Sequence, residues 1–221
     1  MDRPRIELFG DAALLITFGD QIDEAVGRRV RNATLALEQM GATRPAIGAP
    51  VAAYATVLLP FDPLVVGPDE AVGLTIDALA GAIVADPVRE RPIIEIPTRY
   101  DAAAGPDLQE VAEAHGLTVM QAIECHTDAL YVVAFIGFMP GFPYLTGGPA
   151  ELDHPRRATP RTRVPAGSVA VADLQSTVYP FATPGGWNLI GRTDRPMWDV
   201  RRDPPALLAA GSRVRFTQAT D

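Results

Sequence analysis

The chain has 221 residues, of which 48% are hydrophobic and 21% charged, and its formal net charge is −8 at pH 7. This composition is typical of a globular protein with one large domain or two smaller ones, and it excludes a disordered or fibrous chain. The acidic balance argues against nucleic-acid or membrane-surface binding, because both partners attract positive charge. All 19 basic residues are arginines, which excludes a Schiff-base lysine and the lysine of a Walker loop.

Cysteine and histidine content limits the sites that the chain can form. Cys125 is the only cysteine, so no intrachain disulfide is possible, and the three histidines lack metal-ligand spacing, so we expect no metal site. The charged N-terminus, residues 1–5, lacks the apolar stretch of a signal peptide. The uncharged stretch 129–150 contains three prolines and four glycines, which would break a spanning helix. We therefore expect a cytoplasmic protein without a membrane segment.

Near the N-terminus the hydrophobic pattern predicts a hairpin followed by a helix. Residues 5–9 alternate polar and apolar, and residues 12–18 form a second β-rich run. Apolar residues at helical spacing then predict a helix over about 21–40, with Asp20 as its N-cap.

The next elements complete a small first domain. A β-rich run at 54–59 predicts a strand, and Asp69 begins a helix that ends before Asp86-Pro87. The segment 86–92 contains two prolines and alternating charges, and we interpret it as a linker. Strands and helices together predict a small α/β domain at residues 1–88.

The second half has a different pattern. One strand at 93–96 precedes two short predicted helices at 107–115 and 118–126. From Tyr131 onward, short β-like runs alternate with proline and glycine, which favours a compact β-barrel or sandwich over a βαβ sheet. We place the second domain at 89–221, and the predicted fold class of the whole chain is α+β.

An aromatic stretch stands out at residues 135–145, Phe-Ile-Gly-Phe-Met-Pro-Gly-Phe-Pro-Tyr-Leu. Aromatic side chains on glycine and proline turns form rigid walls that suit a small-molecule pocket or a docking surface. The alternative is that these side chains fill the core beneath a loop. The candidate binding residues here are Phe138, Pro140, Gly141, Phe142 and Tyr144.

Four arginines follow within nine residues, 155–163, with no acidic residue among them. Guanidinium groups bind carboxylate or phosphate through paired hydrogen bonds, so an anionic substrate is a natural interpretation. A solvated loop, balanced by acidic residues elsewhere, is the alternative. We select Arg157 and Arg161 as the candidates that face a site.

A third group follows between residues 164 and 187. Gly185 and Gly186 would let main-chain amides approach a ligand, or would permit positive φ in a turn beside Trp187. Gln175 and Tyr179 offer neutral hydrogen-bonding groups for an amide or lactam, unless the backbone satisfies both of them. We assign these five residues to substrate binding.

His126 is the best candidate for general acid–base chemistry. It lies at the end of a predicted helix, where its alternative role is to bond the last carbonyls. The adjacent Cys125 points about 100° away on a helix, so the two do not form a nucleophile–base pair.

Several long motifs resemble the family of the 5-oxoprolinase B subunit, also called the KipI family of histidine-kinase inhibitors or allophanate hydrolase subunit 1. The similarity runs almost end to end along the chain. The motifs are Gly137-Phe-Met-Pro-Gly-Phe-Pro-Tyr-Leu145, Pro155-Arg-Arg157, Pro160-Arg161, Val164-Pro-Ala-Gly-Ser168 and Pro184-Gly-Gly-Trp-Asn-Leu-Ile-Gly-Arg-Thr193.

This resemblance implies a small α/β N-terminal domain and a cyclophilin-like β-barrel. It further implies a component that is inert alone and that acts with two others, the carboxyltransferase-related C subunit and the A subunit of 5-oxoprolinase. Such a complex opens 5-oxoproline, a lactam, to glutamate at the expense of ATP. Carried over by position, His126, Arg157 and Arg161 become catalytic, and the aromatic and glycine residues named above bind substrate together with Pro140 and Gln175. The first domain offers no catalytic signal, and we assign it to assembly.

One segment departs from the family pattern. Two expected glycines are Asp173 and Thr177, and threonine at a position that needs positive φ would be strained. Either the loop has another shape or the substrate differs. Two alternatives therefore stand beside the 5-oxoprolinase interpretation, namely a subunit of a urea or allophanate carboxyltransferase-type complex and a binding protein that inhibits a histidine kinase.

Overall fold

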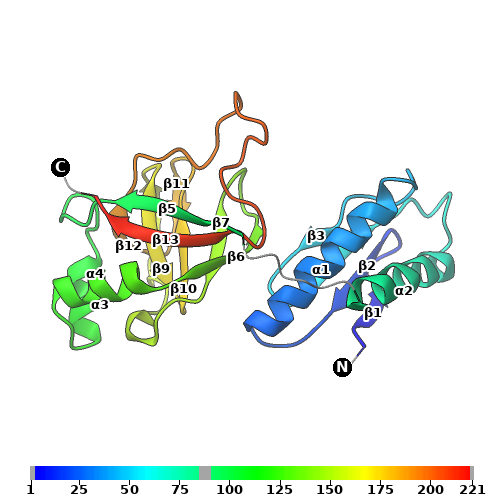
Figure 1. The fold of residues 1–221 in the computed structure, drawn as a ribbon, viewed down its shortest axis with the longest axis horizontal. Coiled ribbons are helices and arrows are strands. Elements are labelled where there is room, and N and C mark those ends of the chain that lie inside the picture. Colours follow the sequence, from blue (N-terminus) through cyan, green and yellow to red (C-terminus); the bar gives the residue numbers. More distant parts are fainter. Residues whose placement is uncertain (1–2, 85–90, 220–221) are drawn as a thin grey trace. The chain divides into compact units, whose positions relative to one another are not determined.

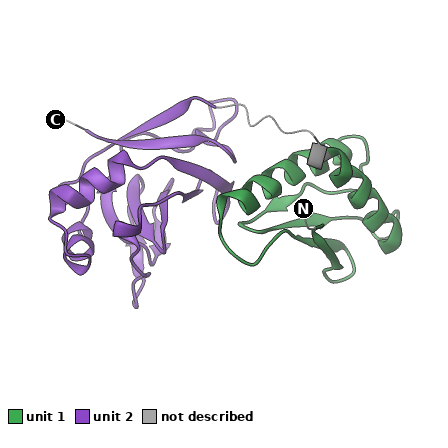
Figure 2. Cartoon of the chain, turned by 60° about the horizontal axis from the view of Figure 1, so that its bottom comes forward, with its two compact units in different colours: residues 1–90 green, residues 91–221 purple. Residues whose placement is uncertain are grey.

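The computed structural model describes residues 3–84 and 91–219. The chain divides into two compact units, residues 1–90 and 91–221 (Figures 1 and 2). Most of the predicted linker, 86–92, and the predicted boundary at residue 88 lie outside the described residues. Within the described ranges, no helix is both long and apolar enough to cross a membrane.

The first unit is an antiparallel sheet with two helices. The strand order is β1-β2-β4-β3, and the buried faces of α1 and α2 share one hydrophobic core with β2 and β4. The predicted hairpin and both predicted helices are present, whereas the short strand β3 was not predicted. The elements are β1 (Arg5–Leu8), β2 (Ala13–Thr17), α1 (Glu24–Gly41), β3 (Val51–Ala52), β4 (Thr56–Pro60) and α2 (Pro68–Val84).

Helix α1 begins later than the sequence pattern suggested. The N-cap is Asp23, not Asp20, and the Asp23 carboxylate accepts the Val26 N–H at 2.9 Å. A capping carboxylate satisfies one of the free N–H groups of the first turn. Both aspartates precede apolar helical positions, so the pattern alone did not separate them.

The second unit is built on a seven-stranded sheet that nearly closes into a barrel. The strand order is β12-β9-β10-β7-β6-β13-β5, and β13 pairs with β5 in parallel. The two edge strands meet at one antiparallel bridge between Arg99 and Arg192. The large strands are β5 (Ile93–Thr98), β6 (Tyr131–Ile136), β7 (Pro143–Thr146), β9 (Ser168–Ala172), β10 (Gln175–Val178), β12 (Asn188–Arg192) and β13 (Arg213–Gln218).

Smaller elements surround this barrel. A two-stranded ribbon pairs β8 with β11. The mixed helix and strand content and the barrel-like sheet confirm the predicted α+β class, with a barrel and not a sandwich in the second half. The remaining elements are α3 (Leu108–Ala114), α4 (Val119–Asp128), the 3-10 helix η1 (Ala150–Leu152), β8 (Arg161–Val164) and β11 (Thr183–Gly185).

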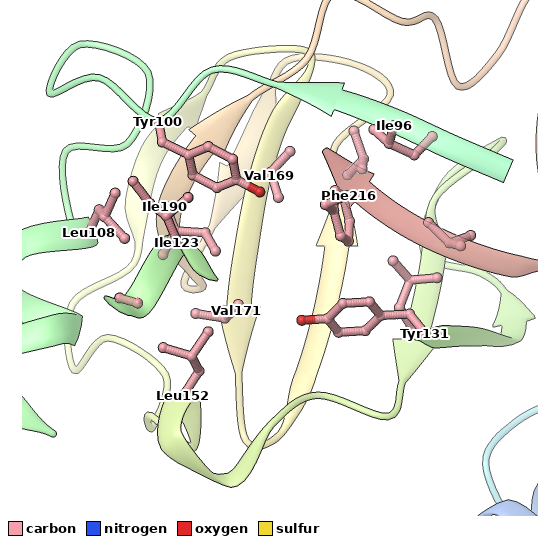
Figure 3. Packing of buried hydrophobic residues seen from close by; sticks show 14 of the residues in the cluster. Ile96, Tyr100, Leu108, Ile123, Tyr131, Leu152, Val169, Val171, Ile190 and Phe216 are labelled. Carbon is pink, nitrogen blue, oxygen red and sulfur yellow. The ribbon is translucent and has the colours of Figure 1, made fainter. Parts of the chain in front are cut away.

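The barrel sheet is buried on both faces. Val169 and Val171 of β9 point into the main core together with Tyr131 and Phe216 (Figure 3). The alternate residues of β9, Ala170 and Ala172, pack instead in a second cluster. Because successive side chains on a strand point to opposite faces, the sheet separates these clusters. We call the first the barrel core; the second contains the aromatic cluster, defined as Phe142, Tyr144, Tyr179 and Trp187.

A capping box fixes the start of α4. The Thr118 hydroxyl accepts the Gln121 N–H at 3.3 Å, and the Gln121 side chain accepts the Thr118 N–H at 2.9 Å. Thr118→Ala should therefore lower the free energy of unfolding of the second unit by about 1 kcal/mol, whereas Thr118→Ser keeps the oxygen and should cost much less. Urea unfolding followed by tryptophan fluorescence reports on this unit, because Trp187 and Trp198 both lie in it. Equal losses for the two variants would contradict the capping role.

Candidate site around Asp107

A buried carboxylate, Asp107, is the centre of the charged cluster in the second unit. It is 3% exposed and lies at the N-cap position of α3, yet its side chain does not cap that helix. It accepts Nη1 of Arg157 at 2.8 Å, and Nη1 and Nη2 of Arg161 at 2.8 and 2.7 Å. It also accepts the Leu189 N–H of β12 at 2.7 Å. The paired contact from Arg161 has the geometry of the strongest charge-assisted hydrogen bonds.

The two predicted arginines are therefore brought together, and each has an internal partner. Their side chains are 30% and 25% exposed, so both also reach solvent. Two guanidinium groups against one buried carboxylate leave one positive charge in excess. The Glu110 carboxylate lies 3.9 Å from Nη1 of Arg157 but is largely exposed, so it neutralises the charge of Arg157 only weakly. The cluster can still hold an anion at its solvent side.

Asp107 was not among the predicted site residues. It precedes Arg157 by 50 positions and Arg161 by 54, and no spacing rule connects residues that far apart. Two signals were available: an aspartate at the expected start of a helix, which predicts an N-cap and not an ion pair, and the similarity of residues 105–108 to the family, which assigned Asp107 no role.

The aromatic cluster is packed edge to face. The Phe142 ring centroid lies 5.2 Å from Tyr179 and 5.0 Å from Tyr144, and the Tyr144 centroid lies 6.1 Å from Trp187. Phe142, Tyr179 and Trp187 are buried, whereas Tyr144 is half-buried. Three of these predicted binding residues thus fill the interior, and Tyr144 reaches the surface.

Phe138 differs from the other aromatic residues of its loop. It is 64% exposed, its φ is +65°, and its ring lies edge-on to Phe142 at 5.3 Å. Gly141 also has a positive φ, +76°, and a Cβ there would lie 3.1 Å from Cβ of Trp198. A left-handed conformation is costly for a phenylalanine, and it occurs here within the tight turn between β6 and β7, where Pro140 is also exposed. The loop therefore presents the Phe138 ring to solvent.

Gly185 makes room for a neighbouring side chain. Neither Gly185 nor Gly186 has positive φ, and a Cβ on Gly185 would lie 2.5 Å from the hydroxyl of Tyr179. Burial raises the pKa of Tyr179 to about 12, opposed by a hydrogen bond between its side chain and the Trp187 backbone. The absence of a side chain at Gly185 is thus explained by packing, and positive φ is not the reason.

The glycine pair offers a matched test of this packing. Gly185→Ala should lower the free energy of unfolding by about 1–3 kcal/mol, the usual cost of overpacking. Gly186→Ala should be tolerated, because its Cβ would meet only ordinary contacts, the nearest at 3.5 Å from Pro160. Thermal unfolding of both variants checks this; a larger loss for Gly186→Ala would contradict the packing argument.

The segment that departs from the family pattern forms a tight hairpin turn. Positive φ occurs at Asp173 and Leu174, the two residues between β9 and β10, which is typical of a type I′ hairpin. Thr177 lies in β10 and has no positive φ; its hydroxyl donates to the Pro143 carbonyl at 2.7 Å. The strain expected at Thr177 is therefore absent, whereas Asp173, the other departing residue, does adopt a positive φ.

The same turn reaches toward the aromatic cluster. Asp173 lies 3.7 Å from Nε of Arg156, and the Arg156 guanidinium lies over the Trp187 ring at 5.6 Å. Gln175 is buried at the start of β10. Asp173 thus takes part in an ion pair that the expected glycine could not form.

His126 lies on the other side of the sheet. It is 0% exposed, with Nδ1 2.8 Å from the Tyr100 hydroxyl and Nε2 3.2 Å from the Ser176 hydroxyl. Ser176 donates to the Ala170 carbonyl, so it accepts from Nε2–H, which leaves Nδ1 to accept from Tyr100. The Phe216 ring packs at 4.4 Å. The structure therefore does not bring His126 together with the arginines, and its geometry is that of a satisfied core histidine.

Burial lowers the pKa of His126 from its ordinary 6.5 to about 3. Below pH 6.5, His126 binds a proton in the unfolded chain but not in the folded chain, so the free energy of unfolding decreases as the pH falls from 6.5 toward 3. Each pH unit should cost about 1.4 kcal/mol from this one group. We expect His126→Gln to reduce the slope of the unfolding free energy against pH in this window by up to about 1.4 kcal/mol per pH unit, which corresponds to one proton. An unchanged slope, measured by urea unfolding across the range, would contradict a neutral buried imidazole.

Two sizeable cavities lie elsewhere. One, of about 590 Å³, lies between α1 and α2 of the first unit. The other, of about 540 Å³, lies where β5 and β12 meet. Neither is lined by the predicted site residues. No group of three His, Cys, Asp or Glu side chains that could hold a metal occurs within residues 3–84 and 91–219.

Comparison with known proteins agrees with this architecture. Residues 4–208 match the family model of the carboxyltransferase domain, subdomains C and D, which defines the class of the protein. A Bacillus subtilis protein named as the B subunit of 5-oxoprolinase is 37% identical over 228 residues, covering 99% of this chain and 94% of the relative. Within its class, the chain belongs to the 5-oxoprolinase B-subunit family, and the resemblance in its motifs is confirmed.

Solved structures share the fold of this chain. The crystal structure of TTHA0988 superposes on 95% of this chain with a TM-score of 0.82, and the two sequences are 37% identical. This chain spans 40% of that longer protein. The Kluyveromyces lactis urea carboxylase has a TM-score of 0.75 at 18% identity, covering 98% of this chain and 22% of that protein. The second likeness shows a shared fold.

Proposed function

We propose that this chain is the B subunit of an ATP-dependent 5-oxoprolinase, a hydrolase complex that opens 5-oxoproline to glutamate. The observation that carries the proposal is the 37% identity along nearly the whole chain to a protein of that name. By the same argument the chain works with the A and C subunits of such a complex and is inactive alone. We place the complex in the cytoplasm, because its reaction uses ATP.

The Asp107 cluster supplies a site for the substrate's carboxylate. The contacts to Asp107 use Nη1 of Arg157 and both Nη atoms of Arg161, and a guanidinium has five N–H donors. Donors beyond these contacts are left to pair with a carboxylate at the solvent side. Asp107 is a positioning residue, since it fixes both guanidinium groups before substrate binds.

The aromatic and amide groups complete the proposed site. Tyr144 and the exposed Phe138 provide apolar walls for the ring of the lactam. Gln175 remains our proposal for the hydrogen bonds to the lactam amide. His126 takes no part in this scheme, because the barrel sheet lies between it and the aromatic cluster.

An unstrained lactam needs activation before water can open it. The lactam oxygen would take the γ-phosphoryl group of ATP, with release of ADP. Water would then add to the activated carbon, and the C–N bond would break as the nitrogen takes up a proton. The resulting acyl phosphate would be hydrolysed to glutamate and inorganic phosphate. No residue of this chain is assigned to the nucleotide in that step. Trapping of a phosphorylated intermediate supports the scheme, and rapid turnover without ATP contradicts it.

The site is tested by arginine variants in the assembled complex. Arg161→Gln should lower kcat/KM for 5-oxoproline by roughly ten-fold or more, because a charge-assisted contact is lost. Arg163→Gln, an exposed position on the same strand, should leave turnover unchanged. Glutamate formation is measured with this chain mixed with the products of its neighbouring genes, and size-exclusion chromatography checks assembly.

Arg157→Gln gives a second test if Arg161→Gln unfolds the barrel. Full activity of both variants in intact complex would contradict the site. Absence of any 5-oxoprolinase activity in a well-formed complex would instead favour another small amide, as in a urea or allophanate carboxyltransferase-type complex. The inhibitor alternative would be favoured if substitutions of exposed surface residues, and not of the site residues, changed the inhibition of a sensor histidine kinase.

A further inference from the structure

The point where the barrel closes, which we call the seam, carries a second charged site. Its cavity of about 540 Å³ is lined by Pro97, Arg99, Arg192, Thr193, Asp194, Arg195 and Ala219. Three of these residues are arginines and one is an aspartate, an excess of two positive charges in a chain of net charge −8. None of them belongs to the Asp107 cluster.

Barrel closure forces two of these arginines together. The Arg99 N–H donates to the Arg192 carbonyl at 2.8 Å, and the Arg192 N–H donates to the Arg99 carbonyl at 2.9 Å. Residues that exchange both hydrogen bonds lie directly opposite and point to the same face of the sheet. Two like charges in this position destabilise the pair unless an anion balances them.

Protein groups in the described part of the chain balance them only in part. Asp194 lies 3.3 Å from Nη2 of Arg99, but it is 81% exposed, so this pair is weak. Nε of Arg99 has no hydrogen-bond acceptor among the described residues. The nearby Asp101 carboxylate, whose pKa is lowered by the N–H groups of Ala104 and Ala103 and further by the charge of Arg99, offsets part of the Arg99 charge but does not line the cavity.

The third arginine is held in place by the backbone. Nη1 of Arg195 donates to the Glu95 carbonyl at 2.5 Å, and the Arg195 N–H donates to the Thr193 hydroxyl at 3.1 Å. A carbonyl partner orients a guanidinium without neutralising its charge. The turn therefore keeps a positive charge beside the arginine pair.

We propose that the seam binds the phosphate group of a small molecule. A phosphate carries close to two negative charges at neutral pH and offers three oxygens, which match an excess of two positive charges and forked guanidinium donors. The cavity volume lies in the range of small-molecule sites, about 300–1,000 Å³. The proposal does not depend on the function of the Asp107 cluster.

The test is calorimetric binding to the full chain at constant ionic strength, with inorganic phosphate, ADP and ATP as probes. Arg192→Gln and Arg99→Gln should each weaken binding roughly ten-fold. Arg28→Gln removes an exposed arginine of the first unit and should leave binding unchanged. Tighter binding of ADP and ATP than of phosphate identifies a nucleotide; equal binding identifies a free phosphate or simple phosphate ester.

Two results would overturn the proposal. One is absence of binding of all three probes into the millimolar range. The other is binding that Arg192→Gln and Arg99→Gln leave unchanged. Tryptophan fluorescence unfolding of both variants establishes that any loss of binding occurs in a folded barrel.

Discussion

A buried carboxylate must be stabilised by hydrogen bonds or opposite charges that replace its contacts with water. The partners of the buried Asp107 carboxylate come from segments far from it in the sequence. Asp107 takes N–H donors from the loop before β8, from β8 itself and from the backbone of β12. An unpaired buried charge would cost several kcal/mol. The arginines must therefore stay where the carboxylate is, and their position relative to the aromatic cluster follows from it. At the anion site that we propose here, the charge pattern would therefore be set before any ligand arrives.

The barrel sheet divides polar groups between its two faces. On one face, His126 is enclosed by the barrel core and bonded to Tyr100 and Ser176; burial holds its imidazole neutral. On the other face, the aromatic cluster reaches the surface through Tyr144. The alternation of side chains along β9 and β10 produces this division. It also explains why a histidine with the right chemistry for catalysis has a structural position.

Local patterns in the sequence were sufficient to predict most helices and strands. They were not sufficient to predict the strand pairing and ion pairs that connect these elements. Helical spacing predicted α1, α2 and the pair α3 and α4, and turn residues predicted a β-barrel or sandwich in the second half. The short strand β3 and the shift of the α1 cap from Asp20 to Asp23 depend on pairing and capping geometry that periodicity does not encode. The parallel pairing of β13 with β5 and the bridge that closes the barrel join residues far apart in the sequence. Arg157 and Arg161 were predicted from local charge, but their partner Asp107 was not, because only the folded chain brings them together.

In our proposal, Asp107 acts on the reaction through the arginines that it holds. A double-mutant cycle on kcat/KM in the assembled complex tests this most directly, with Asp107→Asn and Arg161→Gln made singly and together. We predict that Asp107→Asn costs much less in the Arg161→Gln background than in the wild type, with a coupling of about ten-fold. Additive losses, with the complex intact, would contradict the account.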